Sequence, residues 1–461
     1  MPITGAFILP HPPIILHEVG HGEETKIQKT INSYKEIAKR IAELKPDTIV
    51  LSSPHSIMYA DYFHISPGRV ANGNLREFKA PSVSVSVEYD VEFVSSLEES
   101  AKNANIAAGI LGEKGTSLDH ATIIPLTFIN ELYSNYKLVR IGLSGLPVAD
   151  HYKLGMCVAD VAKSSGNNVV FVASGDLSHK VSADGPYGFA AEGLEFDKEI
   201  IDAMAKGDFL RFLTFTPAFT EKAAECGLRS FIIMAGALDG KNVKSELLSY
   251  EGTFGVGYAV ASFIPMDDNK NRHFLERFLT IEENRMQTIK DCEDEYVRLA
   301  RYSLEHYVTT GKPVKLPDTL LEELLKNKAG VFVSLKKQGN LRGCIGTISP
   351  VTNCIAEEII QNAISACAQD PRFEPVQPEE LSELVYNVDV LSPSEPITSA
   401  AMLDVKRYGV IVTSGYKQGL LLPNLDGVNT IEQQISIAMQ KAGIHQDEKY
   451  SLARFEVVRH K

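Results

Sequence analysis

The first 265 residues alternate short apolar runs with amphipathic helical stretches, and this alternation constrains the fold more than any other feature. Such a pattern is typical of a sheet covered on both faces by helices. We therefore expect an α/β domain over residues 1–265, with a central sheet and helices on both faces. The predicted strands are Gly5–Leu9, Thr48–Ser52, Ser82–Val87, Leu138–Leu143, Val169–Ala173 and Gly257–Ile264, and the predicted helices are Thr25–Leu44, Glu192–Lys206 and Glu221–Leu238.

A polar segment that begins with proline, Pro265–Arg272, has no apolar periodicity and is expected to separate two domains. A long charged helical stretch follows from His273 to about Tyr307. Beyond it, Gly339–Asn340 fits a hairpin turn between two β-rich runs. We expect a smaller α+β domain over residues 273–461. Its predicted elements are strands Gly330–Leu335, Leu341–Ile348, Leu384–Leu391, Gly409–Val412 and Gly419–Leu422, and helices Thr352–Cys367 and Thr430–Ala442.

The charge and hydropathy of the chain exclude some classes of binding partner. Its 461 residues include 46 Lys and Arg against 59 Asp and Glu, a formal net charge of −13. An acidic chain is not expected to bind nucleic acid or an anionic membrane, because both need a basic face. No apolar run approaches the ~20 residues that span a bilayer, and the first residues lack the basic region of a secretory signal. We expect a soluble cytoplasmic protein that forms a homo-oligomer.

Three histidines occupy equivalent places in three separate strand-loop units. His11 follows the first strand in LPHPP, His55 follows the second in SSPHS, and His179 follows a later strand in SGDLSH. Ligands bind at the carboxyl edge of an open α/β sheet, so the three imidazoles are expected to converge there. Pro10 and Pro54 stiffen the approach to two of them. The alternative is that these are unrelated loop histidines.

A metal centre is the chemistry that this arrangement favours. Two neutral imidazoles and one carboxylate form a facial triad that leaves positions open on Fe(II) for substrate and dioxygen. Glu251, in LLSYEGTFGVGYAV just before a buried strand, is the candidate carboxylate. The alternative for Glu251 is an ordinary surface glutamate.

The whole first domain, about residues 3–264, resembles the class III extradiol ring-cleavage dioxygenases, the LigB-like family to which the Memo proteins are related. The resemblance rests on LPHPP, SPHS, LDHATIIPL, SGDLSH, ECGLRS and SYEGTFGVGYAVASF. It implies an oxidoreductase that acts on a small catechol-type aromatic substrate and dioxygen. It also implies non-haem Fe(II) as cofactor, although the sequence leaves zinc or another divalent metal open.

Carried over residue by residue, the resemblance implies that His11 and His55 bind the metal and that Glu251 is the third ligand. His179 would act as acid and base, since its type of side chain titrates near neutrality. His120 would line the substrate pocket, and its alternative role is to fix the turn at the preceding aspartate. Asp176 would orient His179 or contribute to the pocket.

Memo-like relatives differ at the third ligand, because a cysteine replaces the carboxylate near the final strand. No cysteine occurs here between Tyr250 and Ile264, and Glu251 is present. We therefore expect the dioxygenase-type set of two histidines and a carboxylate. A metal-containing binding or scaffold protein without ring cleavage remains the alternative function.

Residues from about 290 to 461 resemble the AMMECR family, on the motifs VRLARYSLEHYV, NLRGCIGTISP, SACAQDPRFEPV, DVLSPSEPI, RYGVIV, GLLLP and QQISIAMQKAGI. The fusion of the two domains resembles the A protein of the AmmeMemoRadiSam system. This resemblance implies a radical-SAM protein as a partner in a modification pathway.

One thiol of the second domain is a candidate reactive group. LRGCIGT places Cys344 beside Arg342, and a nearby guanidinium would lower the pKa of the thiol. The alternative is a buried structural cysteine. Arg372, in DPRF, would bind an anionic group or pair with Asp370.

Overall fold

The computed structural model describes residues 3–115, 117–317, 319–425 and 427–461. The chain divides into two compact units, Met1–Ile281 and Glu282–Lys461. The division falls inside helix α10 (Phe274–Cys292), whereas the sequence placed a linker at 265–272. That segment instead completes strand β10 (Tyr258–Asp268) and adds a short 3-10 helix (Lys270–Arg272).

A six-stranded sheet forms the centre of the first unit, in the order β7-β2-β8-β1-β10-β9. Neighbouring strands among β7, β2, β8 and β1 pair in parallel, and β10 and β9 extend the sheet antiparallel. The parallel strands therefore end at one edge, which is where loop residues can converge. The bounds are β1 (Ile3–Leu9), β2 (Thr48–Ser53), β7 (Lys137–Gly142), β8 (Val169–Ser174) and β9 (Lys241–Glu251).

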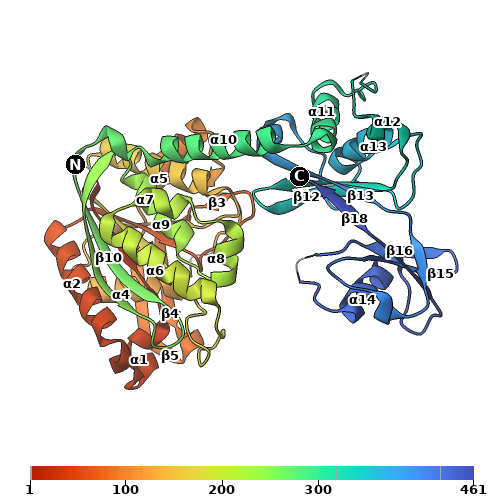
Figure 1. Ribbon diagram of the computed structural model, residues 1–461. Helices are drawn as coiled ribbons and strands as arrows, with labels where there is room; N and C mark the ends of the chain where they lie inside the picture. Colours follow the sequence, from red (N-terminus) through yellow and green to blue (C-terminus); the bar gives the residue numbers. More distant parts are fainter. Residues whose placement is uncertain (1–2, 116, 318, 426) are drawn as a thin grey trace. The chain divides into compact units, whose positions relative to one another are not determined.

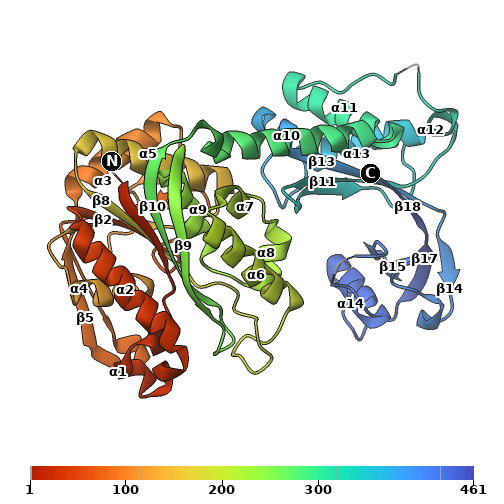
Figure 2. The same cartoon turned by 60° about the vertical axis from the view of Figure 1, so that its left-hand side comes forward.

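Helices cover both faces of this sheet, as predicted, and each face has its own core (Figures 1 and 2). Successive side chains of β1 point to opposite faces. Ala6 and Ile8 pack into one core, and Phe7 and Leu9 pack into the other. The Phe7 side holds α2 (Gln28–Leu44) and α4 (His120–Asn130), and the opposite side holds α3 (Val91–Asn103), α5 (Val148–Ser165), α6 (Ala191–Lys206), α7 (Phe209–Leu213) and α9 (Leu228–Ala237).

Helix α2 shows why the sequence pattern predicts these elements well. Ile31, Tyr34, Ile37 and Ile41 recur every three or four residues, so they form one buried stripe. The helix ends at Leu44 because the next residue, Lys45, turns into the left-handed region with φ 48°. The apolar stripe thus fixes the face of α2 that covers the sheet.

The predicted strand Ser82–Val87 lies outside the central sheet. It is part of β5 (Ala80–Glu88), which pairs antiparallel with β4 (Val70–Leu75) as a separate hairpin. Val83, Val85 and Val87 are buried, and the serines between them are exposed. Period-two alternation identifies a strand with one covered face, but it does not say which sheet the strand joins.

Two helices predicted as continuous are interrupted. The stretch Glu221–Leu238 forms α8 (Pro217–Ala223) and α9, with a loop over residues 224–227 between them. The stretch from His273 to Tyr307 forms α10 and α11 (Glu295–Thr310), because Asp294 caps α11 by accepting hydrogen bonds from two backbone N–H groups. Strand β9 was not predicted. None of the helices in the described part of the chain has the length and apolar character needed to cross a membrane.

The second unit is α+β, as predicted, and contains two antiparallel sheets. The first, β12-β11-β13-β18, packs against α11 and α13 (Ile355–Ala368). The second, β14-β17-β15-β16, packs against α14 (Ile431–Ala442). The strand bounds are β11 (Val331–Lys337), β12 (Asn340–Gly346), β13 (Leu384–Leu391), β14 (Glu395–Ile397), β15 (Gly409–Ser414), β16 (Lys417–Leu421), β17 (Ser451–Phe455) and β18 (Val457–His460).

Candidate metal centre

Three side chains from separate loops bring potential metal ligands together at the carboxyl edge of the first sheet. His11 follows β1, His55 follows β2, and Cys226 lies in the loop between α8 and α9. The Nε2 atoms of His11 and His55 are 3.1 Å apart, and Cys226 Sγ lies 3.6 Å from His11 Nε2. All three ligand atoms lie within 4.8 Å of one another. His11 is buried and His55 is exposed, so the cluster has an open side.

The tautomer of His11 follows from its hydrogen bonds. The Ser174 hydroxyl donates its only hydrogen to the carbonyl oxygen of Ala121, at 2.7 Å. It therefore accepts from His11 Nδ1–H, at 3.0 Å. A neutral His11 then carries its lone pair on Nε2, directed at His55 and Cys226. This is the form of the ring that binds a metal ion.

The spacing of these atoms fits a metal ion of the first transition series. A tetrahedral ion with ordinary bond lengths separates two nitrogen ligands by about 3.4 Å, and nitrogen from sulfur by about 3.6 Å. The observed separations are 3.1 and 3.6 Å. Imidazole with thiolate suits iron, zinc or copper, so the donor set alone does not select among them.

Close contact between two loops positions Cys226. The backbone N–H of Asp176 donates to Cys226 Sγ at 3.3 Å, and the N–H of Gly227 donates to the Asp176 carbonyl at 3.0 Å. A Cβ on Gly175 would lie 2.2 Å from the Cα of Gly227. Glycine at both positions thus lets the loop after β8 meet the loop that carries the thiol.

Glu251 does not join this cluster, which corrects the predicted third ligand. Its carboxylate accepts hydrogen bonds from the backbone N–H and the hydroxyl of Thr30, both at 2.8 Å. Thr30 lies in the first turn of α2, where backbone N–H groups lack partners and a negative charge is stabilised. Glu251 is the last residue of β9 and caps this helix. Cys226, and not Glu251, lies beside His11 and His55.

His120 adjoins the metal ligands, as the first residue of α4. Its ring centroid lies 4.3 Å from that of His55 and 5.4 Å from that of His11. Asp119 caps the helix by accepting from the N–H of Thr122 at 3.0 Å, and it also accepts from the Ser53 hydroxyl at 2.7 Å. Asp119 therefore ties the loop of His55 to the helix of His120. Both predicted roles of His120 are compatible with this position.

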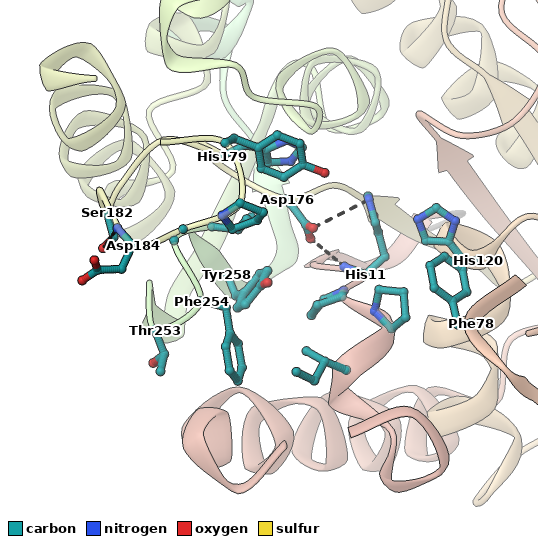
Figure 3. Close-up of a pocket in the computed structure, with 18 of the residues that line it drawn as sticks. His11, Phe78, His120, Asp176, His179, Ser182, Asp184, Thr253, Phe254 and Tyr258 are labelled. Carbon is teal, nitrogen blue, oxygen red and sulfur yellow. Dashed lines mark hydrogen bonds and ion pairs between the residues drawn. The ribbon is translucent and has the colours of Figure 1, made fainter. Parts of the chain in front are cut away.

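His179 and Asp176 both follow β8 but have different contacts. The His179 ring stacks on Tyr187, with centroids 5.2 Å apart. Asp176 accepts from the backbone N–H of His11 at 2.7 Å, and its other oxygen lies 3.9 Å from His11 Nε2. Figure 3 shows the carboxylate directed at His11. Asp176 thus lines the pocket, which is one of its two predicted roles. It contacts His11 and not His179.

Burial governs the protonation of this site. It lowers the pKa of His120 and of His179 to about 4, and it raises the pKa of Asp176 to about 7. Burial and the neighbouring histidines hold the pKa of His11 well below 6.5. The imidazoles are therefore neutral at pH 7, which is the form that binds metals and accepts protons.

A cavity of about 610 Å³ opens beside the ligands. Figure 3 shows Phe78 and His120 at one end and Ser182 and Asp184 at the other. Such a volume is typical of sites for small organic ligands. The lining residues are His11, Pro12, Pro13, Ile14, His55, Phe78, His120, Asp176, His179, Ser182, Asp184, Gly185, Pro186, Tyr187, Thr253, Phe254, Gly255, Val256 and Tyr258.

Comparison with known families identifies a family for each of the two units. The family model of the catalytic LigB subunit of aromatic ring-opening dioxygenase matches residues 5–261, more than half of the chain. The chain belongs to the LigB family. A second model, AMMECR1, matches residues 297–460. The predicted fusion of a LigB domain with an AMMECR domain is confirmed. LigB domains usually bind a metal ion, and the His11, His55 and Cys226 cluster is a possible site for one.

Relatives share one or both domains. A protein of Clostridium acetobutylicum is 44% identical to this chain, with 100% of both chains covered. A protein of Thermotoga maritima is 49% identical over 37% of this chain and 98% of its own length. The crystal structure of an uncharacterized protein from Pyrococcus horikoshii is 35% identical, covers 37% of this chain and 90% of that chain, and has a TM-score of 0.34.

Cys226 is the member of this cluster that was not predicted from the sequence. The stretch around it is rich in alanine and apolar residues, so it reads as one long helix. Gly227, directly after the thiol, was the available signal, because glycine inside a helical pattern weakens the prediction. Glu251 looked suitable because it precedes a buried strand, yet sequence position does not give the direction of a side chain.

The AMMECR domain holds Cys344 in different surroundings from those predicted. Arg342 does not act on the thiol, because its guanidinium binds the Glu380 carboxylate through two hydrogen bonds of 2.9 Å. Instead the Ser334 hydroxyl donates to Cys344 Sγ at 3.2 Å. Cys344 is half-buried in β12.

Arg372 pairs with Asp370, one of its two predicted roles. The same guanidinium also donates to the Cys344 carbonyl at 3.1 Å, and Asp370 accepts from the Cys344 N–H at 2.9 Å. The pair therefore holds the backbone of β12 on both sides of the thiol.

Proposed function

We propose that the LigB domain is an Fe(II)-dependent, dioxygenase-like oxidoreductase that acts on a catechol-type aromatic substrate. The ligands of the metal are His11, His55 and Cys226. The observation that carries the proposal is the position of this cluster: its open side adjoins a cavity that two further neutral histidines line. A binding site for an ion, a pocket for a ring and groups that can take a proton thus meet in one place.

Each part of the chain has a physical role in this reaction. Fe(II) would bring the catechol and dioxygen together in one coordination sphere and supply the electron transfer between them. Pro12, Phe254 and Tyr258 line the cavity and can bind an aromatic ring by apolar contact. His179 is neutral at pH 7, so its imidazole can accept a proton from a substrate hydroxyl.

Dioxygen uptake by the full chain tests this proposal. Protein loaded anaerobically with Fe(II) should consume dioxygen when a catechol is added. His179→Gln should retain the metal and lower the rate by about 100-fold or more, on the scale of a lost acid–base group. His17→Gln is the matched control, because His17 is exposed and pairs with Glu24 outside the cavity. Uptake no faster than that of free Fe(II) with the same catechols would contradict the proposal.

One observation favours a second candidate function. The Cys226 thiol lies beside His11 and His55, where the dioxygenase-type set would have a carboxylate, and Memo-like relatives also have a cysteine as the third ligand. The domain would then be a metal-containing binding protein that holds an aromatic ligand without cleaving it. The AMMECR domain would assist a radical-SAM partner in a modification pathway. Binding of a catechol to the metal-loaded protein without dioxygen uptake would support this function over the first.

A further inference from the structure

A second cavity, of about 810 Å³, adjoins the one described above. The two share His55, Phe78 and His120 as a common wall. Figure 3 shows Phe78 and His120 at the end of the first cavity where this wall lies. A ligand at the metal centre that reaches beyond these three side chains would therefore enter a second space.

The walls of the two cavities differ in chemistry. The first includes the apolar side chains of Ile14, Phe254 and Val256. The second is lined on one side by the β4–β5 hairpin, where Asn72 faces Ser86 and Asn74 faces Ser84 across the strands. These four side chains occupy alternate positions, so they lie on one face of the hairpin.

This hairpin face offers hydrogen bonds from uncharged side chains, and the charged residues Arg76, Glu77 and Asp119 also line the same cavity. The Asn72 amide and the two serine hydroxyls each provide donors and an acceptor. The Asn74 amide provides donors, since its Oδ1 already accepts from the backbone N–H of Arg76 at 3.1 Å. The opposite face carries the buried residues Ala71, Leu75 and Val85, which pack into the core beneath. The polar face of the hairpin is therefore available to a ligand.

The hairpin is also fixed in place beside the metal centre. The N–H of Leu118 donates to the Asn72 carbonyl at 3.0 Å, which ties β4 to the segment that leads to His120. A Cβ on Gly73 would lie 2.6 Å from the Leu118 side chain, so glycine allows the close approach. A polar face held in this way can select a ligand, because little of it must be ordered on binding.

We propose that the substrate of the LigB domain has two parts: a catechol head at the metal and an uncharged arm, rich in hydroxyl or amide groups, along Asn72, Asn74, Ser84 and Ser86. The inference rests on the proposed function, since it takes the catechol head from it. Cavities of ~300–1,000 Å³ hold drug-sized ligands, and a bare catechol would fill only a small part of either one. Specificity therefore lies in the arm.

Binding of two probes to the Fe(II)-loaded full chain, measured by calorimetry without dioxygen, tests the inference. The first probe is catechol, and the second is the 3,4-dihydroxybenzoyl amide of serinamide, which adds a neutral arm. We expect the second to bind about 10-fold more tightly, on the scale of two net hydrogen bonds. Asn72→Ala/Asn74→Ala should remove this difference and leave catechol binding unchanged.

The control variant is Ser95→Ala/Asn103→Ala, because these are an exposed serine and asparagine of α3 that line neither cavity. It should keep the preference for the armed probe. If the first double variant fails to fold, Ser84→Ala/Ser86→Ala on the partner strand serves the same purpose.

The outcomes separate the two proposals. Equal binding of both probes, or a preference that survives both hairpin variants, would overturn the two-part substrate and leave the proposed function standing. Failure of both probes to bind protein that retains Fe(II) would overturn the catechol substrate itself, and the arm with it.

Discussion

Two buried aspartates show how the two domains differ. In the AMMECR domain, Asp370 forms an ion pair with Arg372, and this guanidinium lowers the pKa of the carboxyl to about 2. In the LigB domain, Asp176 lies among histidines, and burial raises its pKa to about 7. One carboxyl is stabilised as an ion by its partner. The other is held near its titration point, which is typical of functional sites.

The same contrast extends to the cationic and imidazole groups. Arg301 and Arg342 in the second unit bind the carboxylates of Glu293 and Glu380. The LigB domain instead gathers His11, His55 and His120 against one another. Neutral imidazoles packed in this way keep lone pairs that can bind a metal ion, whereas the guanidinium groups of Arg301 and Arg342 are already paired with carboxylates.

The largest expected effect concerns the buried pair in the second unit. Glu293→Ala would leave the buried Arg301 with Glu305 alone as a carboxylate partner, and it should lower the free energy of unfolding by about 3 kcal/mol, the lower end of the usual cost of breaking a buried pair. Glu456→Ala breaks an exposed pair with Arg407 and should cost less than about 1 kcal/mol. Urea unfolding of the full chain measures both. Equal changes in the free energy of unfolding would show that burial does not determine how much an ion pair stabilises the fold.

The next effect concerns the orientation of a metal ligand. Ser174→Ala removes the hydroxyl that fixes the tautomer of His11, and it should weaken metal binding by about 10- to 100-fold, as is usual for such partners. Competition with a chelator measures the affinity. Ser178→Ala, in the loop that follows β8, is the control, because that hydroxyl donates to the Ala223 carbonyl. A Ser174→Ala affinity equal to that of the native protein would contradict the tautomer argument.

The sequence predicts features that depend on neighbouring residues, and it does not predict contacts between distant loops. Apolar runs located β1, β2 and β8, and with them the loops of His11 and His55, because a buried parallel strand and its edge are local properties. The third member of the cluster could be predicted only by knowing which loops meet. Cys226 reaches the cluster through a contact between segments 50 residues apart, at Asp176. No periodicity along the chain contains that information.

The remaining effects are those of pH on the metal-free protein. Burial places the pKa of His179 near 4, below the ordinary 6.5, so the unfolded chain binds more protons between these values. The stability of the native protein relative to His179→Gln should therefore rise from pH 4 to 6.5 and then stay constant. The side chain is partly exposed, and screening keeps the change small.

Asp197 should show the opposite sign. Burial raises its pKa to about 7 from 3.8, so the folded protein binds more protons in that window. The stability of the native protein relative to Asp197→Asn should fall as pH rises from about 4 to 7. Thermal unfolding after chelation, at a series of pH values, measures both differences. Two slopes of the same sign would contradict burial as their common cause.

The central claim is that Cys226, with His11 and His55, holds the metal and that Glu251 does not. Metal content of the full chain, purified without oxygen and loaded with Fe(II), tests it most directly in two variants. Cys226→Ser should lose most of the bound iron, whereas Glu251→Gln should retain as much as the native protein, because its carboxylate caps α2. Retention of iron by Cys226→Ser together with its loss from Glu251→Gln would contradict this account.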